Sequence, residues 1–305
     1  MRAPKKNNYF FSQVVVVLVG VALALPAEGR VRKKHKTSGV MRAIPARPED
    51  DPKKRGANPA FRKSAVAFAE PADLSQIEGG PIPIRLVVKG YALGPLKPGG
   101  PSPHAHLIVD NEPALEISDA RVTWTLSGLQ PGPHLVRAVL CRPWHEVVKA
   151  PKAFAMARFW IGPRLGGKAG KAAEYVAWPQ PRKPILTYVL PLGAPADYLK
   201  LEREEGAGDP TEAAPTAEPL PPQSAGANRP VLDFYFSNGK LGRRGDKVKI
   251  VLDRRELPLI TDWKPLPLRR AHKGTRRISI DLLNRRGLKV HNVVNNTDRV
   301  FTVPG

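Results

Sequence analysis

The sequence has a single cysteine, Cys141, among its 305 residues. One cysteine excludes an intrachain disulfide and any metal site built from several thiolates. Aromatic residues are also scarce, at 7% of the chain, and they concentrate in two regions. Each of those regions must therefore build a small hydrophobic core of its own.

Short catalytic signatures are missing as well. The chain has no Gly-x-Ser-x-Gly, no His-Glu-x-x-His and no phosphate-binding loop. A hydrolase needs a nucleophile or a metal, together with an oxyanion site, in mutual geometry. We assign no catalytic residue, and we expect a protein that binds rather than catalyses.

Acidic residues are few relative to basic ones. There are 27 Asp and Glu against 49 Lys and Arg, which gives a formal net charge of +22. Such an excess favours contact with polyanions. No groove-reading element is evident, so specific nucleic-acid recognition is not expected.

Proline and glycine, in contrast, are abundant, with 34 and 26 copies. Between them lie short runs of period-two alternation, as in residues 82–88 and 134–140, separated by turns every 8–12 residues. This spacing indicates an all-β chain with sandwiches of the immunoglobulin or fibronectin type.

The pattern of residues 132–161 returns 142 residues later, at 274–303. Each copy has a glycine, an alternating strand, a polar turn and a closing apolar strand. We therefore predict two tandem β-sandwich domains. The full division is a signal peptide or N-terminal anchor (1–27), a basic disordered arm (28–80), sandwich 1 (81–162), a connector (163–200), a disordered Glu/Ala/Pro linker (201–229) and sandwich 2 (230–305).

The N-terminus resembles a secretory signal, with Arg2, Lys5 and Lys6 before the apolar run 9–25 and small residues after it. Export to the periplasm, the cell envelope or the medium is expected. The basic run 30–36 just beyond the apolar segment weakens the orientation signal. An uncleaved inner-membrane anchor over residues 9–25 is the alternative.

Several short motifs carry a resemblance to a protein family. They lie at 131–134, 142–146, 186–188, 232–238, 262–265 and 282–284, with Asn295, Asn296 and Arg299. On these motifs the chain resembles an uncharacterised family of exported bacterial proteins, found in cyanobacteria and others, with two tandem immunoglobulin-like domains. The resemblance covers about residues 82–305 and implies the architecture and export, without an activity.

Three histidines form a candidate metal site. His104 and His106 are two apart on an expected strand, so their side chains share one face. With His145 from the loop that follows the next long strand, they could bind copper or zinc. The alternative is two polar residues on a solvated strand, with no cofactor at all.

The loop also contains Trp144, His145 and Glu146, which pair a potential base with a carboxylate. This favours either a hydrolase or enzyme-accessory site, or a structural corner. In the structural reading Pro143 sets the turn, Trp144 packs on the sandwich edge, and Arg142 pairs with Glu146.

Paired arginines decorate the second domain, whose residues 230–305 carry a net charge of +10. They indicate a binding surface for an anionic envelope polymer or lipid headgroups, or plain solubilising charge. The candidates are Arg254, Arg255, Arg269, Arg270, Arg276 and Arg277.

Together these features predict an exported, non-enzymatic binding or structural module of the cell envelope. It would contact an anionic partner through its basic surface. A periplasmic metal-binding protein is the second hypothesis, and a hydrolase or accessory domain is the third.

Overall fold

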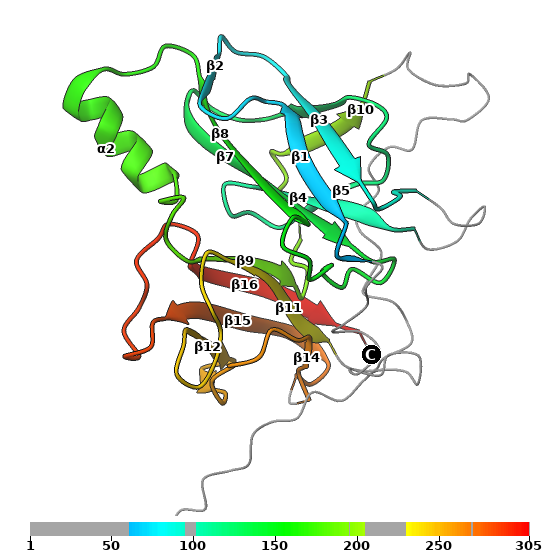
Figure 1. Cartoon of the computed structure of the whole chain (residues 1–305), viewed down its shortest axis with the longest axis vertical. Helices are drawn as coiled ribbons and strands as arrows, with labels where there is room; N and C mark the ends of the chain where they lie inside the picture. The colour runs from blue at the N-terminus through cyan, green and yellow to red at the C-terminus, as the bar shows by residue number, and fades with distance from the viewer. Residues whose placement is uncertain (1–60, 95–101, 195, 205–229, 270, 305) are drawn as a thin grey trace, which may run out of the picture. The chain divides into compact units, whose positions relative to one another are not determined.

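The computed structural model describes residues 61–94, 102–194, 196–204, 230–269 and 271–304, all within one compact unit of the chain, Val40–Gly305. The regular secondary structure of the described chain is nearly all β-strand, as predicted (Figure 1). None of its helices is long and apolar enough to cross a membrane. The predicted signal segment 1–27, the arm up to residue 60 and the linker from residue 205 to 229 lie outside the described residues.

The first sandwich has a four-stranded sheet in the order β1-β3-β6-β10 and a five-stranded sheet in the order β2-β8-β7-β4-β5. Its strands are β1 (Ala65–Glu70), β2 (Ser75–Ile77), β3 (Ile82–Lys89), β4 (His104–Val109), β5 (Leu115–Ile117), β6 (Trp124–Ser127), β7 (Gly132–Cys141), β8 (Phe154–Ile161) and β10 (Lys200–Arg203).

The second sandwich has a three-stranded sheet, β14-β11-β9, and a four-stranded sheet, β13-β12-β15-β16. Its strands are β9 (Ile185–Leu190), β11 (Val231–Ser237), β12 (Lys247–Leu252), β13 (Arg255–Glu256), β14 (Leu266–Pro267), β15 (Gly274–Leu283) and β16 (Asn296–Val303).

Alternation in the sequence explains which faces are buried. In β3, Ile82, Ile84 and Leu86 point into the first core, while Arg85 faces solvent. In β15, Ile278 and Ile280 do the same for the second core. Full burial of each such side chain stabilises the fold by about 1.5–3 kcal/mol.

The predicted internal repeat is present in the strand register. Gly132 pairs with Ile161 at one end of β7 and β8, and Gly274 pairs with Val303 at the corresponding end of β15 and β16. The two strand pairs match residue for residue at an offset of 142 positions. In Figure 1, β7 lies beside β8, and β15 lies beside β16.

Three stretches differ from the prediction. The arm was expected to continue to residue 80, but β1 and β2 occupy part of it, and β1 pairs with β3. The positions that alternate with Val66 and Phe68 in β1 are alanines rather than polar residues, so no apolar–polar alternation marks this strand. The expected connector contains the helix α2 (Gly167–Ala177) and β9, which pairs with β11 and so belongs to the second sandwich. Residues 200–203, from the last residue of the expected connector into the expected linker, form β10 and pair with β6.

Candidate metal centre

Strand β4 places His104 and His106 on one face, as their spacing predicted. The strand lies inside its sheet, between β5 and β7, so all six of its residues are buried. His104 keeps 1% of its surface exposed and His106 keeps none. These histidines therefore do not lie on a solvated strand, and they need polar partners.

His145 comes from the turn that follows β7. The Arg142 N–H donates to the Glu146 carbonyl at 2.8 Å, and the His145 N–H donates to the Arg142 carbonyl at 2.8 Å. This closed turn holds His145 at φ +64°. A residue with a Cβ adopts that left-handed conformation at a cost of about 1 kcal/mol or more.

The second sandwich shows which residue this turn ordinarily favours. There the Asn284 N–H donates to Leu288, and the Gly287 N–H donates to Asn284, in the same pattern 142 positions later. The left-handed position is Gly287, at φ +81°. A histidine therefore stands in the first sandwich where the equivalent turn uses glycine, and strain kept in this way is typical of functional positions.

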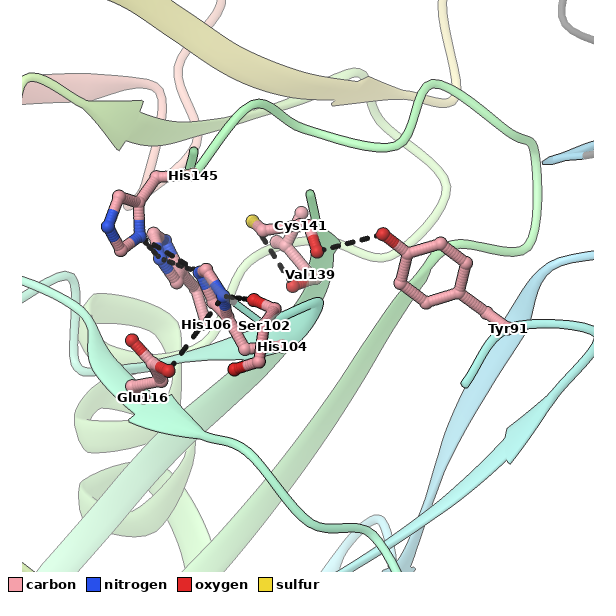
Figure 2. Close-up of polar contacts among 8 residues, drawn as sticks. All are labelled: Tyr91, Ser102, His104, His106, Glu116, Val139, Cys141 and His145. Carbon is pink, nitrogen blue, oxygen red and sulfur yellow. Dashed lines mark hydrogen bonds and ion pairs between the residues drawn. The ribbon is translucent and has the colours of Figure 1, made fainter. Parts of the chain in front are cut away.

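The three side chains converge on one point (Figure 2). Nε2 of His104 lies 3.1 Å from Nε2 of His106, and Nδ1 of His145 lies 3.1 Å from Nε2 of His106 and 2.9 Å from Nε2 of His104. The described residues contain one group of three such ligand atoms within 4.8 Å of one another, and it is this one. The Cys141 thiol does not belong to it.

No choice of neutral tautomers satisfies this triangle. Each ring presents one nitrogen, which carries either a proton or a lone pair. With three nitrogens and two states, at least two must be alike, so one contact joins two donors or two acceptors about 3 Å apart. A cation that accepts all three lone pairs removes the conflict.

Neighbouring groups fix the tautomer of His104. Its Nδ1 lies 2.8 Å from the Ser102 carbonyl, which only accepts, so the proton sits on Nδ1 and Nε2 is bare. Oε1 of Glu116 lies 3.8 Å from the same Nδ1. Metal-ligating histidines commonly donate their second ring N–H to a carbonyl or carboxylate in this way.

His106 is the least satisfied ring. Its Nδ1 is buried without a hydrogen-bond partner among the described residues. The neutral ring must carry one proton, either on Nδ1 without an acceptor or on Nε2 inside the crowded triangle. If Nε2 of His106 bound a metal, its lone pair would be used for that bond, and the ring proton would be on Nδ1.

Burial keeps the cluster uncharged. It lowers the pKa of His104, against the opposing charge of Glu116, and lowers the pKa of His145 to about 3. Burial and the two neighbouring rings hold the pKa of His106 well below its usual range. At neutral pH the three nitrogens are therefore free of the extra protons that would compete with a metal.

The rest of the loop is arranged around Trp144. Its Nε1 donates to Oε2 of Glu146 at 2.9 Å, and the Arg142 guanidinium lies 5.6 Å from the ring centroid of Trp144 and 4.6 Å from that of Phe61. These contacts join Trp144 to Glu146 and to Arg142 within the turn that holds His145.

The arginines singled out in the second domain lie on different elements, with Arg255 on β13 and Arg276 and Arg277 on β15. Arg277 forms an ion pair with Asp298 at 2.7 Å, and Arg276 with Asp253 at 3.5 Å. Three others, Arg254, Arg255 and Arg269, are exposed, and Arg270 is outside the described residues. Two of the six charges are thus already matched by acids.

Glu116 was missed in the sequence, although a signal existed. The turn at Asn111 joins β4 to β5, and in that hairpin His106 pairs directly with Glu116. Counting back from the turn would have placed a carboxylate beside the His104–His106 face.

Comparisons with known proteins are sparse. No protein-family model and no curated protein matches the chain. Among solved structures, fibronectin(III)-like modules of Clostridium thermocellum CbhA align at 11% identity over 78% of this chain and 94% of theirs, with a TM-score of 0.23. A Bacteroides ovatus glucan-utilization protein, SGBP-B, in complex with a mixed-linkage heptasaccharide, aligns at 12% identity over 78% of this chain and 70% of its own, with a TM-score of 0.21. Scores this low carry no argument about function.

Proposed function

We propose that this chain is a metal-binding β-sandwich protein that holds one zinc ion on His104, His106 and His145. The observation that carries the proposal is the mutual approach of three buried ring nitrogens to 2.9–3.1 Å. The export expected from the N-terminal sequence would place this site in the periplasm, the envelope or the medium.

The ligand set favours certain metals. Imidazole nitrogens suit zinc, copper, iron and nickel, whereas calcium and magnesium prefer oxygen. The three distances between the ring nitrogens are nearly equal. A square-planar copper(II) site with three imidazoles would need one trans pair about 4 Å apart, twice a metal–nitrogen bond of about 2.0 Å. The triangle has no such pair and favours a tetrahedral ion.

The fit to zinc is close. Tetrahedral Zn–N bonds of about 2.0–2.1 Å require about 3.3 Å between ligand nitrogens. The observed triangle needs to widen by a few tenths of an ångström. Three protein ligands leave the fourth zinc position for water or another ligand.

The test is zinc titration of the purified full chain after metal removal, followed by calorimetry. The wild type should bind one equivalent and gain about 2.7 kcal/mol of stability at a zinc concentration one hundred times Kd. His145→Gly removes one ligand yet suits the left-handed turn, so it should fold and lose the high-affinity equivalent.

His291→Ala is the matched control, because His291 is exposed and lies outside the cluster. It should bind zinc as the wild type does. Undiminished zinc affinity in His145→Gly, or no uptake by the wild type, would sink the proposal.

A further inference from the structure

The corner that holds the histidines in the first sandwich has an equivalent in the second. His104 pairs with Cys141 where β4 begins, and Lys247 pairs with Leu283 where β12 begins. The turn after β7 is closed by a bridge from Cys141 to Val147, and the turn after β15 by one from Leu283 to Lys289. The same strand pair and the same turn therefore frame both corners.

Basic side chains occupy this second corner. Lys247 stands in the place of His104, and its Nζ donates to the carbonyls of Gly245 at 3.1 Å and Arg285 at 3.4 Å. It thereby ties the loop before β12 to the turn after β15. Between these two segments lies an open depression of about 530 Å³. We call it the basic corner, and its charged and amide lining residues are Lys240, Arg244, Asp246, Asn284, Arg285 and Arg286.

The backbone around the basic corner is held firmly. Asp246 N–H donates to the Lys240 carbonyl at 2.9 Å, and Oδ2 of Asp246 accepts from the Lys240 N–H at 3.3 Å. Oδ1 of Asn284 accepts the N–H groups of Arg286 at 2.9 Å and Leu288 at 3.1 Å. The carboxylate of Asp246 and the amide oxygen of Asn284 thus bind the main chain, while the side chains of Lys240, Arg244, Arg285 and Arg286 are exposed.

The arginines of the basic corner differ from those at the other end of β15. Arg276 and Arg277 are matched by Asp253 and Asp298. Within the described part of the chain, the guanidinium groups of Arg244, Arg285 and Arg286 contact no carboxylate. All three are exposed. Unpaired cations gather at one end of the strand.

We infer that the basic corner is a binding site for an oxyanion-bearing ligand, namely a sugar or polymer unit that carries phosphate or carboxylate groups. The planar fork of arginine matches both groups with paired hydrogen bonds. The depression is larger than a single phosphate needs and falls within the usual size of small-molecule sites, about 300–1,000 Å³. The duplicated corner would then bind a cation in one sandwich and an anion in the other.

The inference goes beyond zinc binding, since it depends on a different sandwich and different side chains. The test is isothermal titration of the metal-free full chain with two probes, inorganic pyrophosphate and a trigalacturonate, at about 0.15 M salt to screen diffuse attraction. Saturable binding is expected with at least one probe. The stronger probe identifies the phosphate or the carboxylate as the natural group.

Two charge-matched variants separate a site from general basicity. The triple change Arg244→Gln, Arg285→Gln and Arg286→Gln should weaken binding at least about tenfold, because it removes charge-assisted hydrogen bonds. The triple change Arg254→Gln, Arg255→Gln and Arg269→Gln removes the same charge from the same sandwich and should change affinity much less. All six residues are exposed, and equal thermal midpoints would confirm that both variants fold.

Equal losses in the two variants would overturn the inference, because only the summed charge would then matter. Absence of saturable binding for both probes in the wild type would overturn it as well. Unchanged binding in His145→Gly is expected whether or not zinc binds, so the two proposals fail independently.

Discussion

Both ring nitrogens of His134 lie next to hydrogen-bond acceptors. Its Nδ1 lies 2.5 Å from Oδ2 of Asp110, and its Nε2 lies 2.6 Å from the Gln130 carbonyl. Only the protonated ring has two N–H donors to serve them. Burial lowers the pKa of His134, but the hydrogen bond and charge of Asp110 and the Gln130 carbonyl more than offset this and raise it above 6.5.

This raised pKa predicts a pH effect on stability. A group whose pKa is higher in the folded state stabilises fully below its unfolded pKa, and that contribution is lost as pH rises through the folded pKa. Urea midpoints of the wild type should therefore fall above about pH 6.5, the unfolded histidine value. His134→Gln should flatten this part of the profile. An identical slope in the variant would contradict the assignment.

The three histidines of the candidate metal site could be named from the sequence, but their convergence could not be derived from it. Period-two spacing was enough to put His104 and His106 on one face. The approach of His145 depends on its φ of +64°, a conformation that is uncommon for residues other than glycine. A sequence rule expects glycine or asparagine there, so the exception became visible only in the structure.

At the scale of elements, the turns after β7 and β15 form an internal control. They share their hydrogen bonds and differ at the left-handed position, His145 against Gly287. A Cβ built on Gly287 would meet nothing within 4 Å. Any penalty for a side chain there is therefore one of backbone conformation alone.

Gly287→Ala should accordingly destabilise the protein by about 1 kcal/mol. His145→Gly without metal should stay within about 1 kcal/mol of the wild type, because relief of strain offsets the added freedom of the unfolded glycine. Chemical denaturation measures both. Arg286→Ala, in the same turn as Gly287, should change stability by less than about 0.5 kcal/mol. If Gly287→Ala left the free energy of unfolding unchanged, the left-handed conformation would cost little in this turn, and His145 would not be strained.

Element prediction succeeded where alternation was long and failed where it was short. β7 and β15, with ten residues each, were found in the right places. β10 has four residues and β2 has three, too few for a period to show. β9 is buried at all six positions, and such a continuous apolar run does not show which strand is its partner, here β11.

At the scale of the whole molecule, the two sandwiches share buried polar contacts. Asp233 on β11 is fully buried and accepts from the Val147 N–H at 2.9 Å and from Lys149 Nζ at 2.8 Å. Arg137, also fully buried, donates to Thr187 Oγ1 at 3.0 Å. Val189, Leu190 and Tyr235 of the second sandwich also pack in the first hydrophobic core, so separation of the sandwiches would break these contacts and expose apolar surface.

We therefore expect one cooperative transition in scanning calorimetry, with the van't Hoff enthalpy close to the calorimetric enthalpy. Asp233→Asn removes one partner of a buried ion pair. It should lower the midpoint temperature of this single transition and reduce the free energy of unfolding by about 3–5 kcal/mol. Asp262→Asn, in an exposed pair with Lys264 at 3.9 Å, should cost less than about 1 kcal/mol. Two resolved transitions would contradict the coupling.

The number of sandwiches could be predicted from composition and repeat, but their exact membership could not. β9 joins the second sandwich and β10, which follows it, returns to the first. No local sequence pattern indicates that the chain crosses back to the first sandwich at β10. Pairing between short strands that are distant in sequence depends on the assembled core rather than on the residues of the strands themselves.

Because β10 follows the strands of the first sandwich at a distance, β6 is synthesised well before its neighbour in the sheet. β6 ends at residue 127 and its neighbour β10 begins at residue 200. At about 5–20 residues per second, the edge of β6 waits about 4–15 s for its partner on the ribosome. An unpaired strand edge is a template for another chain. Neighbouring nascent chains on one messenger are exposed to mispairing during that interval, and slower translation between the two strands lengthens it.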